Sequence, residues 1–100
     1  MLLTRIRIVG PSMEPALRTG DWWLVVRTQR VAPGNVILLR HPLRPDLLVV
    51  KRVVRADGGG WWVEGDNAQS SDDSRHFGPV STSDVIGRVW WRYHPLRRGG

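Results

Sequence analysis

The chain contains no cysteine, and only one of its 15 basic residues is a lysine. The absence of cysteine excludes disulfide bridges, thiol nucleophiles and thiolate metal ligands. No run approaches the ~18 consecutive apolar residues that cross a bilayer as a helix, and residues 1–3 are too short for a signal peptide. We therefore expect a cytoplasmic protein, or a membrane-associated one if the chain is truncated.

The 100 residues are 41% hydrophobic and 24% charged, which is typical of one small globular domain. We expect this domain to span residues 1–95 and a disordered tail to follow at 96–100. The net charge of +6 favours a polyanion or an anionic membrane as a partner. A solvated C-terminal stretch is the simpler explanation for four of the arginines, which are Arg88, Arg92, Arg97 and Arg98.

Short apolar segments separated by glycine and proline predict strands at 4–9, 22–27, 36–40, 47–55, 61–64 and 85–93. We expect segment 22–27 to pair with 36–40, and 47–55 to form a hairpin with 61–64 through the glycine turn at 58–60. Residues 41–46 are expected to be a connection, and 65–78 a polar loop.

No stretch predicts a long amphipathic helix, although residues 13–18 can form one helical turn with Ser12 as its N-cap. The fold is therefore predicted to be mostly β. We expect a coiled antiparallel sheet or a partly open barrel, with at most one or two short helical turns.

Lys51 lies in the segment 47–55, where the period of two places it on one face with Val49 and Val53. Burial of this face would lower the pKa of the lysine and give a neutral amine that can act as a general base. Alternatively, its stem packs on the valines while its charge reaches water, which is the commoner situation for a single lysine in a strand. The other 14 basic positions are arginine, which cannot lose its proton.

Ser12 follows the end of a predicted strand, where its hydroxyl could lie beside backbone N–H groups that accept an oxyanion. A serine at such a place is more often a helix cap, and a nucleophile needs a base from elsewhere in the chain. The loop 65–78 is rich in short polar side chains, which is typical of a solvated loop, but loops of this length are often functional.

Four segments of the chain together resemble the signal peptidase I family. Gly10-Pro11-Ser12-Met13-Glu14-Pro15 resembles its nucleophile box, Ser-Met-x-Pro, and residues 34–42 are similar to its next strand. Val50-Lys51-Arg52-Val53 resembles its Lys-Arg-Val box. Gly65-Asp66-Asn67, Ser71, Asp73-Ser74-Arg75 and Phe77-Gly78 resemble its last box.

The resemblance implies a serine endopeptidase with Ser12 as the nucleophile and Lys51 as the general base, without cofactor or metal. The Ser12 backbone N–H would be one oxyanion donor, in a substrate or oxyanion region that includes Gly10, Pro11 and Met13. Some family members have a serine two positions before the nucleophile as the second donor. Gly10 stands there in this chain, so the second donor is not identified.

The resemblance also implies supporting residues in the last box. Ser71 would orient the Lys51 amine, and Gly65 would let the backbone approach it closely. Asp73 and Arg75 would form an ion pair that fixes the loop. These residues complete the candidate site.

The substrate implied is a protein with an exposed, extended N-terminal segment, bound as an added strand and cleaved after small residues. The short hairpin at 54–64 makes the chain most like the small maturation proteases of nickel-type superoxide dismutase. One alternative is the catalytic domain of a membrane-anchored signal peptidase without its anchor, with peripheral membrane contact. Another is a basic β-barrel that binds nucleic acid, which the four boxes disfavour.

Each of the three Trp pairs is expected to send one ring into the core and one outward, because neighbouring residues in a strand face opposite sides. The pairs are Trp22-Trp23, Trp61-Trp62 and Trp90-Trp91. The outward rings could form an apolar patch or could simply be partly exposed. The histidines His41, His76 and His94 lack metal-ligand spacing and are expected in loops.

Overall fold

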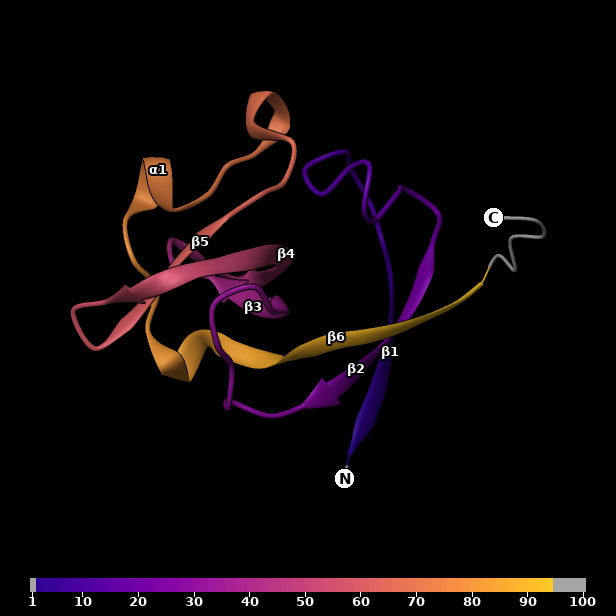
Figure 1. The fold of residues 1–100 in the computed structure, drawn as a ribbon, viewed down its shortest axis with the longest axis horizontal. Helices are drawn as coiled ribbons and strands as arrows, with labels where there is room; N and C mark the ends of the chain where they lie inside the picture. Colours follow the sequence, from indigo (N-terminus) through magenta and orange to yellow (C-terminus); the bar gives the residue numbers. More distant parts are fainter. Residues whose placement is uncertain (1, 95–100) are drawn as a thin grey trace.

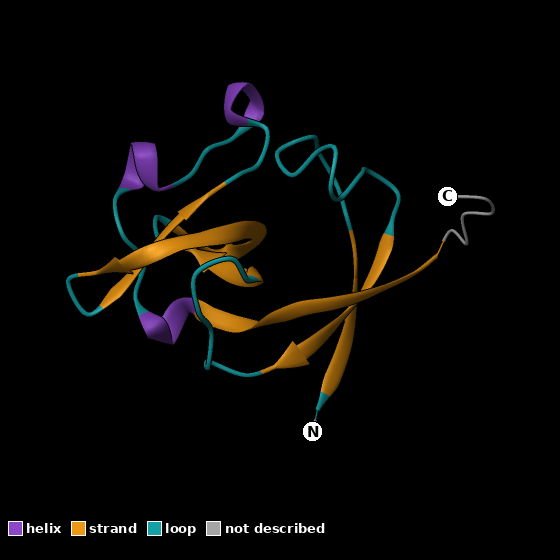
Figure 2. Cartoon of the chain, viewed as in Figure 1, coloured by secondary structure: helices purple, strands orange, loops and turns teal. Residues whose placement is uncertain are grey.

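Six antiparallel strands form one sheet in the order β1-β2-β6-β3-β4-β5 (Figures 1 and 2). The computed structural model describes residues 2–94, so the tail expected at 96–100 lies outside it. The strands are β1 (Leu3–Arg7), β2 (Trp22–Arg27), β3 (Val36–His41), β4 (Arg44–Asp57), β5 (Gly60–Glu64) and β6 (Val85–His94). A short helix, α1 (Ser74–Phe77), and the 3-10 turns η1 (Ala68–Ser70) and η2 (Thr82–Asp84) complete these elements. The sheet is not closed, and the mostly β fold is confirmed.

Strand β6 joins the two halves of the sheet, and Figure 1 shows it running across both. It pairs with β2 on one side and with β3 on the other. The expected pairing of segment 22–27 with 36–40 is therefore wrong. A strand from the far end of the chain lies between them, and local sequence patterns carry no signal for such an insertion.

Two local expectations also change. The predicted connection at 41–46 is instead a tight turn at residues 42–43, because β4 already begins at Arg44. Residues 12–16 form turns rather than a helix, with one helix-like hydrogen bond from the Leu17 N–H to the Met13 carbonyl at 3.0 Å. Within residues 2–94 the Ser12 hydroxyl caps no backbone group. The β4–β5 hairpin forms as predicted, with positive φ angles at Gly58 and Gly59.

Each half of the sheet has its own buried cluster. One lies among β3, β4, β5 and the segment before β6, and consists of Ile37, Leu39, Val53, Val63, Val80 and Val85. The other consists of Ile8, Met13 and Leu17 and lies under the turns that follow β1. Each such apolar side chain contributes roughly 1.5–3 kcal/mol by its burial. The segment around Ser12 is thus anchored in the core through its neighbour Met13.

The tryptophan pairs follow the predicted alternation only in part. Trp23 and Trp61 pack against the two clusters, and their neighbours Trp22 and Trp62 are half-buried. Trp90 and Trp91 are 53% and 59% exposed, so this pair contradicts the prediction. The pairing of β2 with β6 skips residue 90 at a register shift, and a bulge of this kind breaks the alternation of side chains.

Candidate active site

Ser12 lies in the turn that follows β1, where it contacts the loop that precedes η1. The Asn67 N–H donates a hydrogen bond to the Ser12 carbonyl at 2.8 Å, and the Asn67 side-chain amide donates to the Pro11 carbonyl at 3.1 Å. The Asp66 N–H donates to the sulfur of Met13 at 3.4 Å. Figure 1 shows these two loops side by side at the top of the molecule. Residues 66 and 67 therefore hold the backbone on both sides of Ser12 in the chain, at Pro11 and Met13, and at Ser12 itself.

Lys51 projects from β4 into the buried face of the strand and is only 4% exposed. Val53 is buried on the same face, as the period of two predicts. Burial lowers the pKa of the Lys51 amine, and the charge of Arg75 lowers it further, whereas the charges of Asp73 and Asp72 raise it; the net direction is downward. Of the two alternatives for this lysine, the structure shows the buried amine.

Ser71 connects the lysine to a carboxylate. The Ser71 hydroxyl lies 2.6 Å from Asp73 Oδ2 and 3.2 Å from Lys51 Nζ. A hydroxyl has one proton, and an ionised carboxylate can only accept, so Ser71 donates to Asp73 and accepts from Lys51. A neutral Lys51 amine therefore keeps its lone pair free of Ser71.

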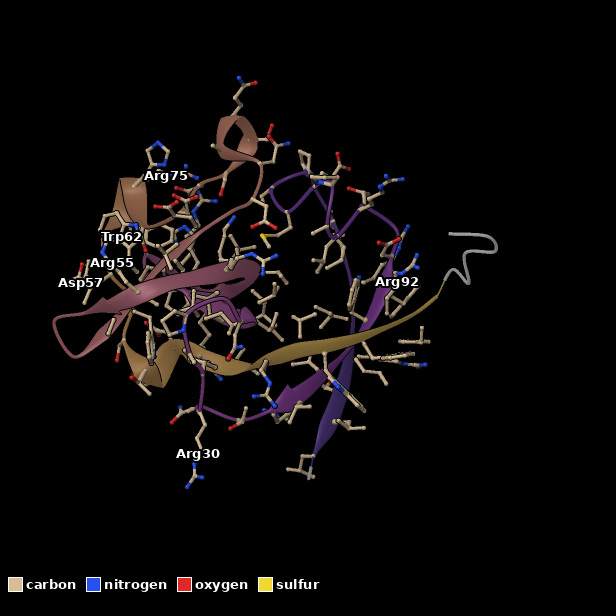
Figure 3. The ribbon with its side chains drawn as sticks, in the orientation of Figure 1. Arg30, Arg55, Asp57, Trp62, Arg75 and Arg92 are labelled. Carbon is tan, nitrogen blue, oxygen red and sulfur yellow. The ribbon has the colours of Figure 1, made fainter. Side chains whose placement is uncertain are left out.

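Asp73 is fully buried and is surrounded by donors. It accepts hydrogen bonds from the Gly65 N–H at 2.8 Å and from Arg75 Nε at 2.9 Å, and forms an ion pair with the same guanidinium. Burial by itself would raise the pKa of this carboxyl, but the hydrogen bonds from Arg75, Ser71 and the backbone outweigh it. They hold the pKa of Asp73 well below its ordinary range. Arg75 is itself a residue of α1 (Figure 3).

Gly65 fills a space that admits no side chain. A β-carbon added there would lie 2.6 Å from the Ser12 carbonyl oxygen and would collide with the Ser71 hydroxyl. Contacts this short do not occur between real atoms, so the glycine permits the close approach of three backbone segments. Ser12, Ser71 and the end of β5 meet at this residue.

Ser12 and Lys51 both line one cavity of about 440 Å³. Its other walls include residues 6–10, at the end of β1 and directly after it, and residues 47–50 of β4. Gly10 and Met13 contribute to this wall, and Gly10 has a φ of 91°, a conformation that favours glycine. The serine box and the lysine box, which are far apart in the sequence, thus line one cavity.

Two residues near the site were given no role from the sequence. Asn67 holds the Ser12 segment, and His41 is not a loop residue but ends β3 with 4% of its surface exposed. Its position at the end of an apolar strand was the available signal for burial. His76 is exposed in α1, which also differs from the loop expected. Within residues 2–94 no three His, Asp or Glu side chains are placed to share a metal ion.

A serine hydroxyl and a desolvated lysine that line one cavity are the components of a nucleophile and base pair, so the site is that of a candidate hydrolase. The Peptidase S24-like family matches residues 3–90 of the chain. The chain belongs to this family of signal-peptidase-like peptidases.

Proteins similar to this chain include mitochondrial proteases. Mitochondrial inner membrane protease subunit 1 of Xenopus tropicalis is 32% identical over 115 residues, which cover 91% of this chain and 69% of the relative. Mitochondrial ATP-independent inner membrane protease subunit 1a of Arabidopsis thaliana is 32% identical over 121 residues, and the match covers 94% of this chain and 72% of the relative. Mitochondrial inner membrane protease subunit 2 of Mus musculus is 32% identical over 102 residues, and the match covers 75% of this chain and 58% of the relative. The part of the present chain that is described has no helix capable of crossing a membrane.

Proposed function

We propose that this chain is a serine endopeptidase that uses Ser12 as its nucleophile and Lys51 as its general base. The observation that carries the proposal is the buried Lys51 amine on the wall of the cavity that Ser12 also lines. A lysine can act as a base only when it is neutral, and burial favours the neutral form. Family membership supports the reaction class.

In the first half of the reaction, the Lys51 amine takes the proton of the Ser12 hydroxyl while Oγ attacks the carbonyl carbon of the substrate. The tetrahedral intermediate collapses when the C–N bond breaks, and the Lys51 ammonium gives its proton to the leaving amine. Ser12 then carries an ester. In the second half, Lys51 deprotonates a water that attacks this ester, and the proton returns to Ser12 Oγ as the acid leaves.

The negative charge on the tetrahedral intermediate requires donors that are already in place. Within residues 2–94 the Ser12 N–H donates to no protein atom, so it is available as one donor. Gly10 offers no side-chain donor, and its φ of 91° disfavours a residue that would. We assign only the Ser12 N–H to this role.

An extended substrate segment fits the cavity because two strand edges face it. β5 pairs with β4 only from residue 52 to 57, so residues 47–50 of β4 have one edge without a neighbouring strand among the described residues. On the opposite wall, β1 is an edge strand of the sheet and residues 8–10 follow it. A peptide could add to these edges through its backbone, with its side chains reading the apolar walls.

The substrate class we propose is the N-terminal leader or propeptide of a protein. The similar mitochondrial inner membrane proteases support leader processing, and a membrane-associated form of this chain is compatible with their names. A narrower candidate is the precursor of nickel-type superoxide dismutase. The support for it is the compact β4–β5 hairpin, whose turn is only Gly58 and Gly59.

The test is cleavage of precursor proteins with extended N-terminal segments, the nickel-type superoxide dismutase precursor among them. The wild-type chain is expected to release one N-terminal fragment, and Ser12→Ala and Lys51→Met to release none. Ser83→Ala, which removes an exposed hydroxyl in η2, is the matched control and should retain full activity. Equal cleavage by Ser12→Ala and the wild type would refute the proposal.

The nucleic-acid alternative receives little support from the arrangement of charge. Arg55 and Arg75 lie on one side of the molecule, whereas Arg30 and Arg92 lie apart from them and from each other (Figure 3). Arg75 is also engaged with Asp73, and Arg52 with Asp66. Non-specific nucleic-acid binding relies on clustered cations that are free to contact phosphates.

A further inference from the structure

His41 contacts the loop that contains Ser71 and Asp73, although no step of the proposed reaction uses it. The Leu43 N–H donates to His41 Nδ1 at 3.1 Å, so this nitrogen carries no proton. The proton of the neutral ring is therefore on Nε2, which lies 2.9 Å from Asp72 Oδ2. The ring also packs edge-on against Phe77 of α1, with 4.9 Å between the centroids. A buried imidazole thus donates a hydrogen bond to one specific carboxylate.

Ser71, which accepts a hydrogen bond from Lys51, is followed in the chain by two carboxylates, Asp72 and Asp73. Asp73 already accepts from Arg75, Ser71 and Gly65, so it cannot turn toward the lysine. Asp72 has a 59% exposed side chain, and its partner besides His41 is His76, which lies at 3.7 Å and is 68% exposed. A contact at this distance between exposed groups restrains a side chain weakly. His41 therefore provides the main restraint on Asp72.

We propose that His41 is a positioning residue that holds the Asp72 carboxylate away from the Lys51 amine and so prevents an ion pair between them. The inference rests on the proposed role of Lys51 as the base. In this proposal His41 restrains the Asp72 carboxylate, as Arg75 restrains the Asp73 carboxylate. An ion pair with a carboxylate would favour the ammonium form of Lys51, which cannot accept the proton of Ser12.

The charged groups around Lys51 agree with this arrangement. Asp72 and Asp73 raise the pKa of the amine, and Arg75 lowers it, while burial is the largest influence. Both carboxylates thus act on the lysine through space, while the hydrogen-bond partner of its amine is the Ser71 hydroxyl. Release of either carboxylate toward the amine would oppose the effect of burial.

Two polar variants separate the contacts of the histidine. His41→Asn retains an acceptor for the Leu43 N–H but is too short to reach Asp72, whereas His41→Gln retains a donor near the position of Nε2. Because Lys51 is the only lysine, its side-chain resonance can be titrated by NMR in each variant. Thermal unfolding tests whether both variants are folded.

His41→Asn is expected to raise the pKa of Lys51 by about one to three pH units, which is the usual effect of a neighbouring opposite charge. His41→Gln should have less than half that effect, and Asp72→Asn added to His41→Asn should restore the wild-type titration. The acidic limb of the pH profile for kcat/KM should move with the Lys51 titration. His76→Leu should leave the pKa of Lys51 within about 0.3 pH units of the wild-type value.

A Lys51 pKa that is unchanged in His41→Asn, or a rise that Asp72→Asn does not reverse, would overturn the inference. Asp72→Asn alone gives a test independent of the folding of any His41 variant. We expect it to lower the pKa of Lys51 by less than about one pH unit, and a larger fall would mean that the carboxylate already pairs with the lysine. An ordinary pKa in the wild-type chain would instead contradict the proposed function.

Discussion

The Ser71 hydroxyl accepts a hydrogen bond from the Lys51 amine at 3.2 Å, and it cannot donate one in return because it donates its only proton to Asp73. This relationship fixes one N–H of Lys51 and leaves the lone pair of the neutral amine for another partner. Ser12, which lines the same cavity, is the partner that the proposed reaction requires.

Removing this hydroxyl should weaken catalysis without abolishing it. Ser71→Ala leaves the base in place but removes its orientation, and a misplaced group typically costs up to about 100-fold in rate. We expect kcat to fall by roughly 10- to 100-fold with little change in KM. Ser71→Thr keeps the hydroxyl and should retain more activity than Ser71→Ala. Steady-state kinetics on one peptide measure both, and equal kcat values for the alanine variant and the wild type would contradict the account.

A buried lysine also costs stability, and the cost depends on pH. The Lys51 pKa is lower in the folded chain than in the unfolded one, so the unfolded chain binds more protons between the two values. Stability from this group therefore rises with pH across that window, by about 1.4 kcal/mol for each pH unit of difference in pKa.

Lys51→Met removes the ionisable group while retaining most of the volume. At pH 7 this variant should be more stable than the wild type, and its advantage should shrink as the pH approaches ~10.4, the ordinary pKa of lysine. Urea unfolding at pH 7 and pH 10 measures the difference. A variant that is less stable than the wild type at both pH values would show that the amine contributes more through its contacts than burial costs.

Asp73 should have the opposite dependence on pH. Its pKa is held well below the ordinary range in the folded chain, so its contribution is complete above the unfolded value of ~3.9 and is lost as the pH falls below it. Asp73→Asn should destabilise the chain by about 3 kcal/mol at pH 7, because it breaks a buried ionic network. The variant should also lose much of the acid dependence between about pH 5 and pH 2. Denaturant titrations over this range test both expectations. If the stability of Asp73→Asn falls with decreasing pH as steeply as that of the wild type, Asp73 is not the source of the acid dependence.

Gly65→Ala tests the close approach of the three segments. The new methyl group would collide with the Ser71 hydroxyl and the Ser12 carbonyl, so both stability and activity should fall, with a loss of about 1–3 kcal/mol in unfolding free energy. Gly58→Ala is the matched control. It places a methyl group in open space at a positive φ, which should cost about 1–2 kcal/mol without affecting activity. Equal retention of activity in the two variants would mean that the site tolerates the displacement.

The sequence predicted the fold class and most strand positions because the alternation in 47–55 and the glycine turn at 58–60 are local signals. It also indicated the residues around the cavity, since the serine and lysine boxes are continuous in the chain. The face of β4 that is buried could not be chosen from the pattern, because each face contains a cation. The packing of Val53 into the core decides that it is the face of Lys51.

The features that the sequence did not predict depend on contacts between distant segments. The insertion of β6 between β2 and β3 is a tertiary choice that neither strand encodes alone. The exposure of both Trp90 and Trp91 follows from a bulge in the pairing of β2 with β6. The burial of His41 depends on Asp72 and Phe77, which come together only when the loop before β6 folds over the end of β3.

The proposed reaction requires Lys51 to be a neutral base at working pH, and the direct measurement is the pH titration of its side chain by NMR in the wild-type chain. The chain has one lysine, so one side-chain signal reports on the site. We expect a pKa clearly below the ordinary value of ~10.4, with a normal value recovered when the chain is unfolded in denaturant. A pKa near ~10.4 in the folded chain would contradict the proposed reaction, because the amine would then be an ammonium that cannot activate Ser12.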